Sequence, residues 1–517
     1  MKKLEKQYLT SSDLCNLKPT KNKKRVLLVN PKKGEAQFTF PHNGLAILAG
    51  ILKKRGHEVL IVDFAFLMEE RNNDISFFLN SFKPDVIGVS IYTTNSKEAD
   101  ILIEKISEIS PDIPLLVGGY HAFMYTDLLQ KNKNIDYIFA GDGELPIIPI
   151  VENAKKEKEP QIIRSEGILR LDDIPLPDYK SFYGWEKMTH YPIMTSRGCP
   201  NKCTFCVNSN LQYRFWRPRD PENCIKELEI AKKEISKDLK ILLFDDCPTT
   251  NKERFTKFLN LYLERIGNEL VIVNTRADSL DEEIIKLMKK CGVLSLAVGV
   301  EHGNPEVFGM INKGETHEEI IKACKLVKKY GLELGVTFII GLPGDTLEKT
   351  KDSIKLCNKL NADIIGVNLL IPLKNTALRT WLDENGAKIY DELDYSSINV
   401  TGLECPRIMV ETLEFSVFER EKAYYMFLFG VTHSKLKLRE LYKIISIANK
   451  YGLYHEFFNW LPGGVLKNFK RTLGLLERGF IVYKKQGWKV ALTRFLNIYT
   501  QNKLVKKRKK NKIDKRI

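Results

Sequence analysis

Residues 191–206, YPIMTSRGCPNKCTFC, place three cysteines in CxxxCxxC spacing directly after a short apolar run. The run predicts a β-strand, so the cysteines are expected in a loop at its carboxyl end. Thiolates are soft ligands that suit iron–sulfur clusters. Three of them leave one iron of a 4Fe–4S cluster open to chelate an amino and a carboxylate group. The spacing therefore predicts that Cys199, Cys203 and Cys206 bind such a cluster.

Zinc is the alternative ligand for these thiols. A structural zinc site usually has four ligands in two pairs, and the sequence holds no second CxxC pair. His190 precedes Cys199 by nine residues and would complete a Cys3His set, although this spacing does not fit a zinc knuckle. The other seven cysteines are scattered singly, as buried thiols are in a reducing cytosol. We favour the cluster and a cytoplasmic location.

Strand and helix patterns alternate on both sides of the cysteine segment. Six apolar runs from 191 to about 382 are each followed by a helical segment, which predicts a partial (β/α)6 barrel with its site at the strand carboxyl ends. A second alternating series over 25–152 predicts a Rossmann-like, doubly wound α/β domain. The expected organisation is an N-terminal extension (1–24), the first α/β domain (25–152), a linker (153–187), the barrel (188–382) and a mostly helical, basic region (383–517).

The barrel segment resembles the radical S-adenosylmethionine (radical SAM) superfamily. Its CxxxCxFC signature is met with Phe205 before the last cysteine. Four further motifs follow in the family's order, namely FDDCPTT (244–250), NTRADSL (274–280), GVEHGNPEV (299–307) and IIGLPGDT (339–346). The resemblance covers about residues 188–380.

This resemblance implies a binding site for S-adenosylmethionine at the barrel rim. Asp245 and Asp246 would accept hydrogen bonds from its ammonium group or its ribose hydroxyls. Glu301 would do the same or would fix Arg276. Gly341 and Gly344 would let the backbone approach the adenine closely. Each acid is alternatively a salt-bridged rim residue, and each glycine a plain turn. The residues assigned to S-adenosylmethionine are Phe205, Asp245, Asp246, Arg276, Glu301 and Gly341.

The first α/β domain resembles the cobalamin-binding domain that precedes many radical SAM enzymes. Four segments match in order, namely 41–63, 84–94, 115–122 and 136–144. The DxHxxG motif, which supplies a histidine to cobalt in several cobalamin proteins, is absent, so the corrin would bind without that ligand. An empty or repurposed domain is the alternative. The residues assigned to cobalamin follow expected strand ends and are Ser90, Thr93, Thr94, Gly118, Gly119, His121 and Gly141.

Together the two resemblances imply a class B-like, cobalamin-dependent radical methyltransferase. The reduced cluster would cleave S-adenosylmethionine to a 5′-deoxyadenosyl radical, and cobalamin would deliver a methyl group to an unactivated carbon. A reductant such as ferredoxin or flavodoxin is expected. The alternatives are a radical cyclase or oxidoreductase of the same architecture, and an iron–sulfur electron carrier or sensor. The GVEHG and GLPGD loops argue against an electron carrier, because electron transfer needs no adenine pocket.

Positive charge is concentrated at the C-terminus. From Val431 onward there are 22 Lys/Arg and 4 Asp/Glu, a balance of +18 within a net +16, so the first 430 residues carry about −2. Residues 477–504 predict a helix with Trp488, Leu492, Phe495 and Tyr499 on one face, which packs on the barrel or lies at an anionic membrane surface. The substrate is expected to be a small molecule or lipid, and nucleic acid is not favoured. No stretch has 18 consecutive apolar residues.

Overall fold

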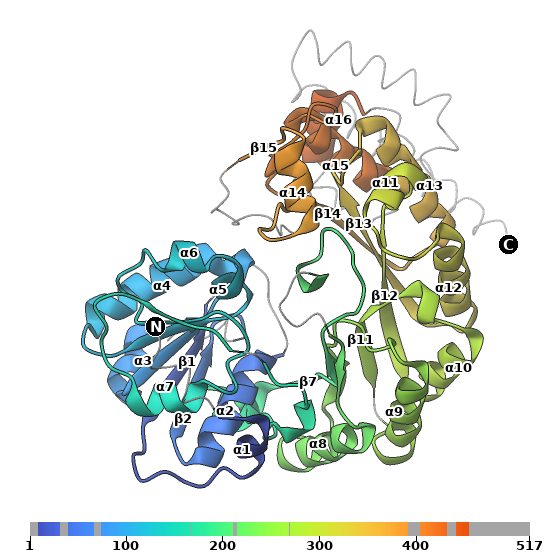
Figure 1. Cartoon of the computed structure of the whole chain (residues 1–517). Coiled ribbons are helices and arrows are strands. Elements are labelled where there is room, and N and C mark those ends of the chain that lie inside the picture. The colour runs from blue at the N-terminus through green and yellow to red at the C-terminus, as the bar shows by residue number, and fades with distance from the viewer. Residues whose placement is uncertain are drawn as a thin grey trace, which may run out of the picture. The chain divides into compact units, whose positions relative to one another are not determined.

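The computed structural model describes residues 9–31, 40–66, 74–165, 167–209, 215–267, 269–390, 404–431 and 441–453. Two sheets dominate these residues, and each consists only of parallel strands. Both belong to one compact unit that ends at Leu428. The expected α/β class, with a doubly wound domain followed by a partial barrel, is confirmed (Figure 1).

The first sheet contains β1 (Arg25–Asn30), β2 (Glu58–Asp63), β3 (Val86–Ser90), β4 (Leu115–Gly118), β5 (Tyr137–Phe139) and β6 (Gln161–Ile163). Their order, β2-β1-β3-β4-β5-β6, reverses direction between β1 and β3. In such sheets ligands bind beyond the carboxyl ends of the strands at this switch point. The helices of this part are α1 (Ser11–Cys15), α2 (Asn43–Arg55), α3 (Ile75–Phe82), α4 (Ser96–Ile109), α5 (Tyr120–Met124), α6 (Thr126–Leu129) and α7 (Ile147–Asn153).

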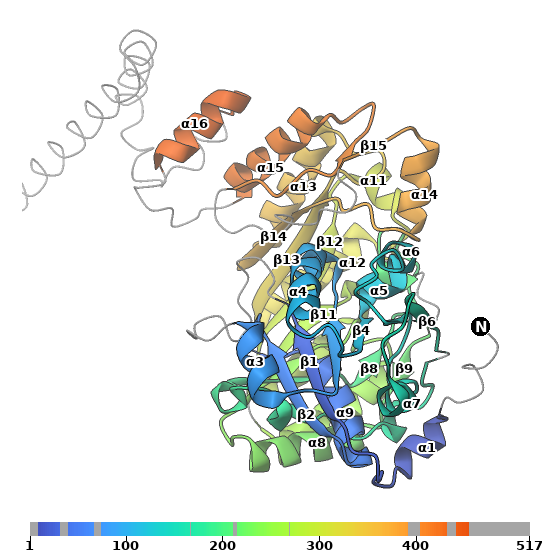
Figure 2. The same cartoon turned by 90° about the vertical axis from the view of Figure 1, so that its left-hand side faces the viewer.

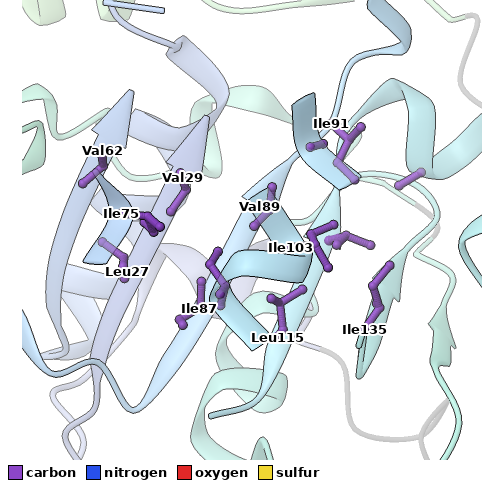
Figure 3. Packing of buried hydrophobic residues seen from close by; sticks show 14 of the residues in the cluster. Leu27, Val29, Val62, Ile75, Ile87, Val89, Ile91, Ile103, Leu115 and Ile135 are labelled. Atoms are coloured by element: carbon purple, nitrogen blue, oxygen red, sulfur yellow. The ribbon is translucent and has the colours of Figure 1, made fainter. Parts of the chain in front are cut away.

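A continuous apolar core joins this sheet to α3 and α4. Leu27, Val29 and Ile87 project from the strands against Ile75 and Ile103 of the two helices, and all five are fully or almost fully buried (Figure 3). Figure 2 shows α3 and α4 in front of the sheet. Burial on both faces explains why β1 and β3 are apolar runs without alternation.

Strand β6 lies within the segment that the sequence predicted to be a linker. It pairs in parallel with β5, with Tyr137 opposite Gln161, and so extends the first sheet. Three residues are too few for a strand pattern to be recognised, because pairing with β5 rather than local periodicity determines this strand.

The second sheet contains β7 (His190–Ile193), β10 (Lys240–Leu243), β11 (Leu270–Thr275), β12 (Val293–Glu301), β13 (Glu333–Ile340) and β14 (Ile364–Leu369), all at predicted positions. The strands neighbour one another in chain order, which gives an open barrel of six βα units. Figure 1 shows the helices on its outer side. They are α8 (Pro221–Glu234), α9 (Lys252–Arg265), α10 (Glu282–Lys290), α11 (Pro305–Met310), α12 (His317–Lys329) and α13 (Leu347–Leu360).

After the barrel the described chain is mainly helical. It contains α14 (Ala377–Glu384), β15 (Lys388–Ile389), β16 (Val410–Glu411), α15 (Val417–Val431) and α16 (Leu441–Tyr451). A second unit begins at Phe429, and α16 is its main described element. The predicted helix at 477–504 and the basic tail lie outside the described residues. None of the described helices has the length and hydropathy needed to span a membrane.

Candidate active site

The three cysteines lie in the loop that follows β7, as predicted. A two-residue antiparallel ribbon, β8 (Ser196–Arg197) with β9 (Arg217–Pro218), closes this loop at its base. The backbone N–H of Cys206 donates to the Cys203 carbonyl at 3.1 Å. Cys199, Cys203 and Cys206 are partly buried, as is Phe205.

The position of His190 bears on the zinc alternative. His190 lies at the amino end of β7, whereas the cysteines follow its carboxyl end. The zinc alternative therefore lacks its fourth ligand.

Cys199 differs electrostatically from the other two cysteines. A hydrogen bond from the buried Cys247 thiol, aided by the Asn201 side-chain amide at 3.2 Å, lowers the pKa of Cys199 below its ordinary value. Burial raises the pKa of Cys206 to about 12 and also raises that of Cys203. Cys247, which the sequence grouped with isolated buried thiols, is thus a neighbour of the cluster loop.

Asp245 and Asp246, after β10, hold the start and end of the cysteine loop. Asp245 is fully buried and accepts hydrogen bonds from Thr195 N at 2.6 Å, Thr195 Oγ1 at 2.7 Å and Ser196 Oγ at 2.5 Å. Burial raises its pKa to about 6. Asp246 accepts from Gly198 N at 3.0 Å and Asn208 Nδ2 at 2.7 Å. Their assignment to S-adenosylmethionine stays a prediction, while their visible contacts order the loop.

Glu301 is paired with a lysine that the sequence analysis did not single out. Lys313 Nζ lies 2.9 Å from Glu301 Oε1 and 3.3 Å from Glu315 Oε2, and it also donates to the Gly299 carbonyl. All three charged groups are buried. Glu301 has φ of 67°, an uncommon conformation for a residue other than glycine, at the bulge that ends β12.

Arg276 does not pair with Glu301, contrary to one of the two roles predicted for that acid. Its guanidinium donates to Asp278 at 2.6 Å and to the Lys313 carbonyl at 2.9 Å, and Nε lies 3.9 Å from Glu315. The lysine neutralises Glu301 instead, because Lys313 returns to the end of β12 after α11. Burial raises the pKa of Cys203, and the positive charges of Lys313 and Arg276 partly oppose this rise.

The GLPGD loop after β13 is ordered by its own Asp345 and lies against His302, which follows β12. Asp345 accepts from Gly341 N at 2.8 Å, and His302 Nε2 lies 3.0 Å from its other oxygen. His302 Nδ1 accepts from Asn304 N at 3.1 Å, so Nε2 carries a proton.

Gly341 has a structural role that the sequence did not suggest. It adopts φ of 92°, and a Cβ added there would lie 1.8 Å from Arg420 Nη1. Arg420, on α15, is 2% exposed and donates to the Gly341 carbonyl at 3.1 Å. The open side of this glycine is therefore occupied by a guanidinium. The predicted contact of Gly341 with adenine would therefore have to be made by backbone atoms of the GLPGD loop.

The residues assigned to cobalamin line the carboxyl edge of the first sheet. Ser90 Oγ lies 3.1 Å from His42 Nε2, and Thr93 Oγ1 lies 3.4 Å from His121 Nδ1. Burial lowers the pKa of each histidine to about 4, so both are neutral. Thr94, Gly118 and Gly141 lie in the same row of strand ends and following loops.

Two details of this edge bear on the fit of a corrin. His42 Nδ1 accepts from Leu45 N at 3.2 Å, which puts its proton on Nε2 toward Ser90 and leaves neither nitrogen free for cobalt. This agrees with the missing DxHxxG motif. A Cβ on Gly119 would meet the Ile91 carbonyl at 2.6 Å, so this glycine serves the close packing of β3 and β4. The other residues assigned to cobalamin at this edge carry hydroxyl groups, glycine backbone or the neutral ring of His121.

The carboxyl edges of the two sheets face each other. Phe40, before α2, packs on Phe244 at the end of β10, with ring centroids 5.7 Å apart. Tyr92 and Tyr120 follow β3 and β4, with centroids 6.1 Å apart, and the negative charge of Asp246 acts on both phenols. Burial is the main cause that raises the pKa of Tyr92 to about 12. Sequence reasoning missed these aromatic residues, although Tyr92 and Tyr120 each adjoin residues it did assign.

Comparisons with known proteins agree with both halves of this site. The model of the radical SAM superfamily matches residues 193–357, and that of the B12 binding domain matches 33–149. An uncharacterized methyltransferase of Pyrococcus horikoshii is 30% identical over 383 residues, which cover 68% of this chain and 82% of that protein. The anaerobic magnesium-protoporphyrin IX monomethyl ester cyclase of Rubrivivax gelatinosus is 26% identical, with 84% of each chain covered.

A solved structure shows the same fold. It is that of the radical S-adenosylmethionine methyltransferase TsrM of Kitasatospora setae with cobalamin and a [4Fe–4S] cluster bound. The TM-score is 0.60 at 16% identity, and the match covers 81% of this chain and 90% of that chain.

Proposed function

The chain belongs to the radical SAM superfamily and carries its B12-binding domain, and on that premise we propose that it methylates an unactivated carbon of a small-molecule or lipid substrate. It is a cobalamin-dependent, methyltransferase-like radical SAM enzyme. Its cofactors are a 4Fe–4S cluster, S-adenosylmethionine and cobalamin. When bound, these groups supply the electron, the radical and the methyl group, respectively.

The facing edges of the two sheets are the observation that carries the proposal. The cysteine loop lies at the carboxyl edge of the second sheet, and the Ser90–His42 pair lies at the carboxyl edge of the first sheet. Phe40 and Phe244 pack against each other between these edges, within one compact unit. A substrate held between these edges would meet both the radical and the methyl donor. The chain's own task is then to position the substrate and to exclude water.

The aromatic side chains between the two sheet edges are suited to bind an uncharged part of the substrate. Tyr120 and Phe244 are 40% and 39% exposed, and Tyr92 and Phe40 extend the same aromatic surface. Aromatic rings bind apolar groups, and phenol oxygens add hydrogen bonds. We propose ferredoxin or flavodoxin as the reductant. We also propose peripheral membrane contact through the basic C-terminal region, which lies outside the described residues.

The test uses full-length protein, reduced anaerobically and supplied with S-adenosylmethionine whose methyl group is deuterated. Small-molecule and lipid extracts serve as substrate pools. We expect 5′-deoxyadenosine, S-adenosylhomocysteine and a product that carries the deuterated methyl group, and we expect neither 5′-deoxyadenosine nor the labelled product from Cys203→Ala. The absence of 5′-deoxyadenosine from protein with intact cluster would refute the radical reaction and leave the electron carrier.

A radical cyclase or oxidoreductase is the second candidate. The observation in its favour is the 26% identity over 84% of each chain with the Rubrivivax gelatinosus cyclase. The same experiment separates the two reactions, because a cyclase or oxidoreductase would form 5′-deoxyadenosine while no product gains the labelled methyl group.

A further inference from the structure

Two arginines lie opposite each other at the base of the cysteine loop. In the β8–β9 ribbon Arg197 pairs directly with Arg217, and the chain between them carries all three cysteines. Like charges directly opposite on paired strands are destabilising. The ribbon therefore needs counter-ions to hold its register.

Those counter-ions come from the first α/β domain. Arg197 Nη1 lies 2.5 Å from Glu144 Oε1, and Arg217 Nη1 lies 2.8 Å from Asp142 Oδ2. Arg217 also donates to the Ile168 carbonyl at 2.8 Å. The Glu144 and Arg217 side chains are only 7% and 8% exposed. Two positive and two negative charges thus form a compact group, which we call the four-charge clamp.

Both acids follow β5 in the segment GDGE (141–144), which begins with Gly141, one of the residues assigned to cobalamin. Gly141 adopts φ of 146°, and its backbone lies at the carboxyl end of the sheet where a ligand is expected. A buried charge is strongly destabilised if its partner moves away. The GDGE segment and the cysteine ribbon must therefore be ordered together.

We propose that the four-charge clamp couples cobalamin binding to occupancy of the cluster loop. A cofactor that orders one side of the clamp lowers the ordering cost that the other cofactor must meet, so each tightens the binding of the other. Asp142, Glu144, Arg197 and Arg217 are positioning residues in this scheme. The inference rests on the proposed function only in that both cofactors bind this chain.

The test compares the dissociation constant of hydroxocobalamin for full-length protein with its cluster and after removal of iron by a chelator. Equilibrium dialysis under anaerobic conditions gives both constants. For the wild-type chain we expect weaker binding after iron removal by at least about fivefold, the lower end of typical coupling between sites. In Glu144→Gln and in Asp142→Asn the two constants should approach each other.

The reciprocal effect gives a second readout. Hydroxocobalamin should slow iron loss to the chelator in the wild-type chain and should do so much less in the two variants. Asp142→Asn changes the more exposed acid, at 22% side-chain exposure, and serves if Glu144→Gln does not fold.

The matched control is Glu152→Gln. It removes an ion pair with Arg55, 2.7 Å long and partly buried, that lies entirely within the first domain. This control should keep the difference between the two constants. Equal constants for the wild-type protein, or an undiminished difference in both clamp variants, would overturn the coupling while leaving the proposed function intact. Failure of the cluster-loaded wild-type protein to bind hydroxocobalamin would overturn both.

Discussion

Replacement of Gly341 by alanine tests whether Arg420 organises the GLPGD loop. The added methyl carbon would lie 1.8 Å from Arg420 Nη1 and 2.8 Å from its Cζ, so the guanidinium would have to move. Arg420 is held on its other side by the Phe415 carbonyl at 3.0 Å and lies over the Phe415 ring. It therefore has little room to withdraw.

Two costs add at this position. A residue other than glycine in the left-handed region costs about 1–2 kcal/mol, and φ at Gly341 is 92°. Loss of the hydrogen bond between the buried guanidinium and the Gly341 carbonyl costs about 1.5–3 kcal/mol, the range for charged groups. Gly341→Ala should therefore destabilise the barrel by about 2.5–5 kcal/mol, a fall in melting temperature on the order of 10 °C.

Calorimetry of the full-length protein measures this fall. Gly386→Ala is the control, because Gly386 also has a positive φ, 66°, but no atom lies within 4 Å of an added Cβ. It should cost only about 1 kcal/mol. In an Arg420→Ala background, Gly341→Ala should lose most of its effect beyond the backbone cost. Equal melting temperatures for Gly341→Ala and Gly386→Ala would refute the role of Arg420.

Three other changes test the remaining parts of the site. Lys313→Met leaves Glu301 buried without a cation and leaves Glu315 only its 3.9 Å contact with Arg276, so it should destabilise the chain by about 3–5 kcal/mol in urea unfolding; an unchanged midpoint would show that the lysine does not neutralise Glu301. Asp246→Ala removes the acceptor of Gly198 N and Asn208 Nδ2 and should speed iron loss to a chelator about tenfold, whereas the exposed Asp238→Ala should not; equal rates would contradict this. His42 has a pKa lowered by burial to about 4, against 6.5 ordinarily. As the pH falls, His42 therefore takes up a proton in the unfolded chain at a higher pH than in the folded chain. The stability that neutral His42 gives is fully present above about pH 6.5 and is lost as the pH falls toward 4, by about 2 kcal/mol between pH 7 and 5. His42→Gln should remove this part of the pH dependence of the unfolding midpoint, and identical pH profiles would argue against it.

The sequence alone determined the order of the elements and the position of the cluster ligands. The apolar runs of β1 and β3 are long enough to indicate a parallel sheet covered on both faces. Cys199, Cys203 and Cys206 lie within eight residues, so their spacing already describes their shared loop. Local patterns suffice where the partners are close in the chain.

Only the tertiary structure revealed which distant groups meet these local features. Lys313 rather than Arg276 neutralises Glu301, Arg420 occupies the open side of Gly341, and the GDGE acids pair with the ribbon arginines. Each of these contacts joins segments that are brought together by the packing of separate helices and strands. Periodicity and motif spacing carry no information on such pairs, because charge and hydrogen-bond partners are chosen by distance in space. The sequence therefore predicted the cysteine loop, but it did not predict the ion pairs that join this loop to the cobalamin-binding domain.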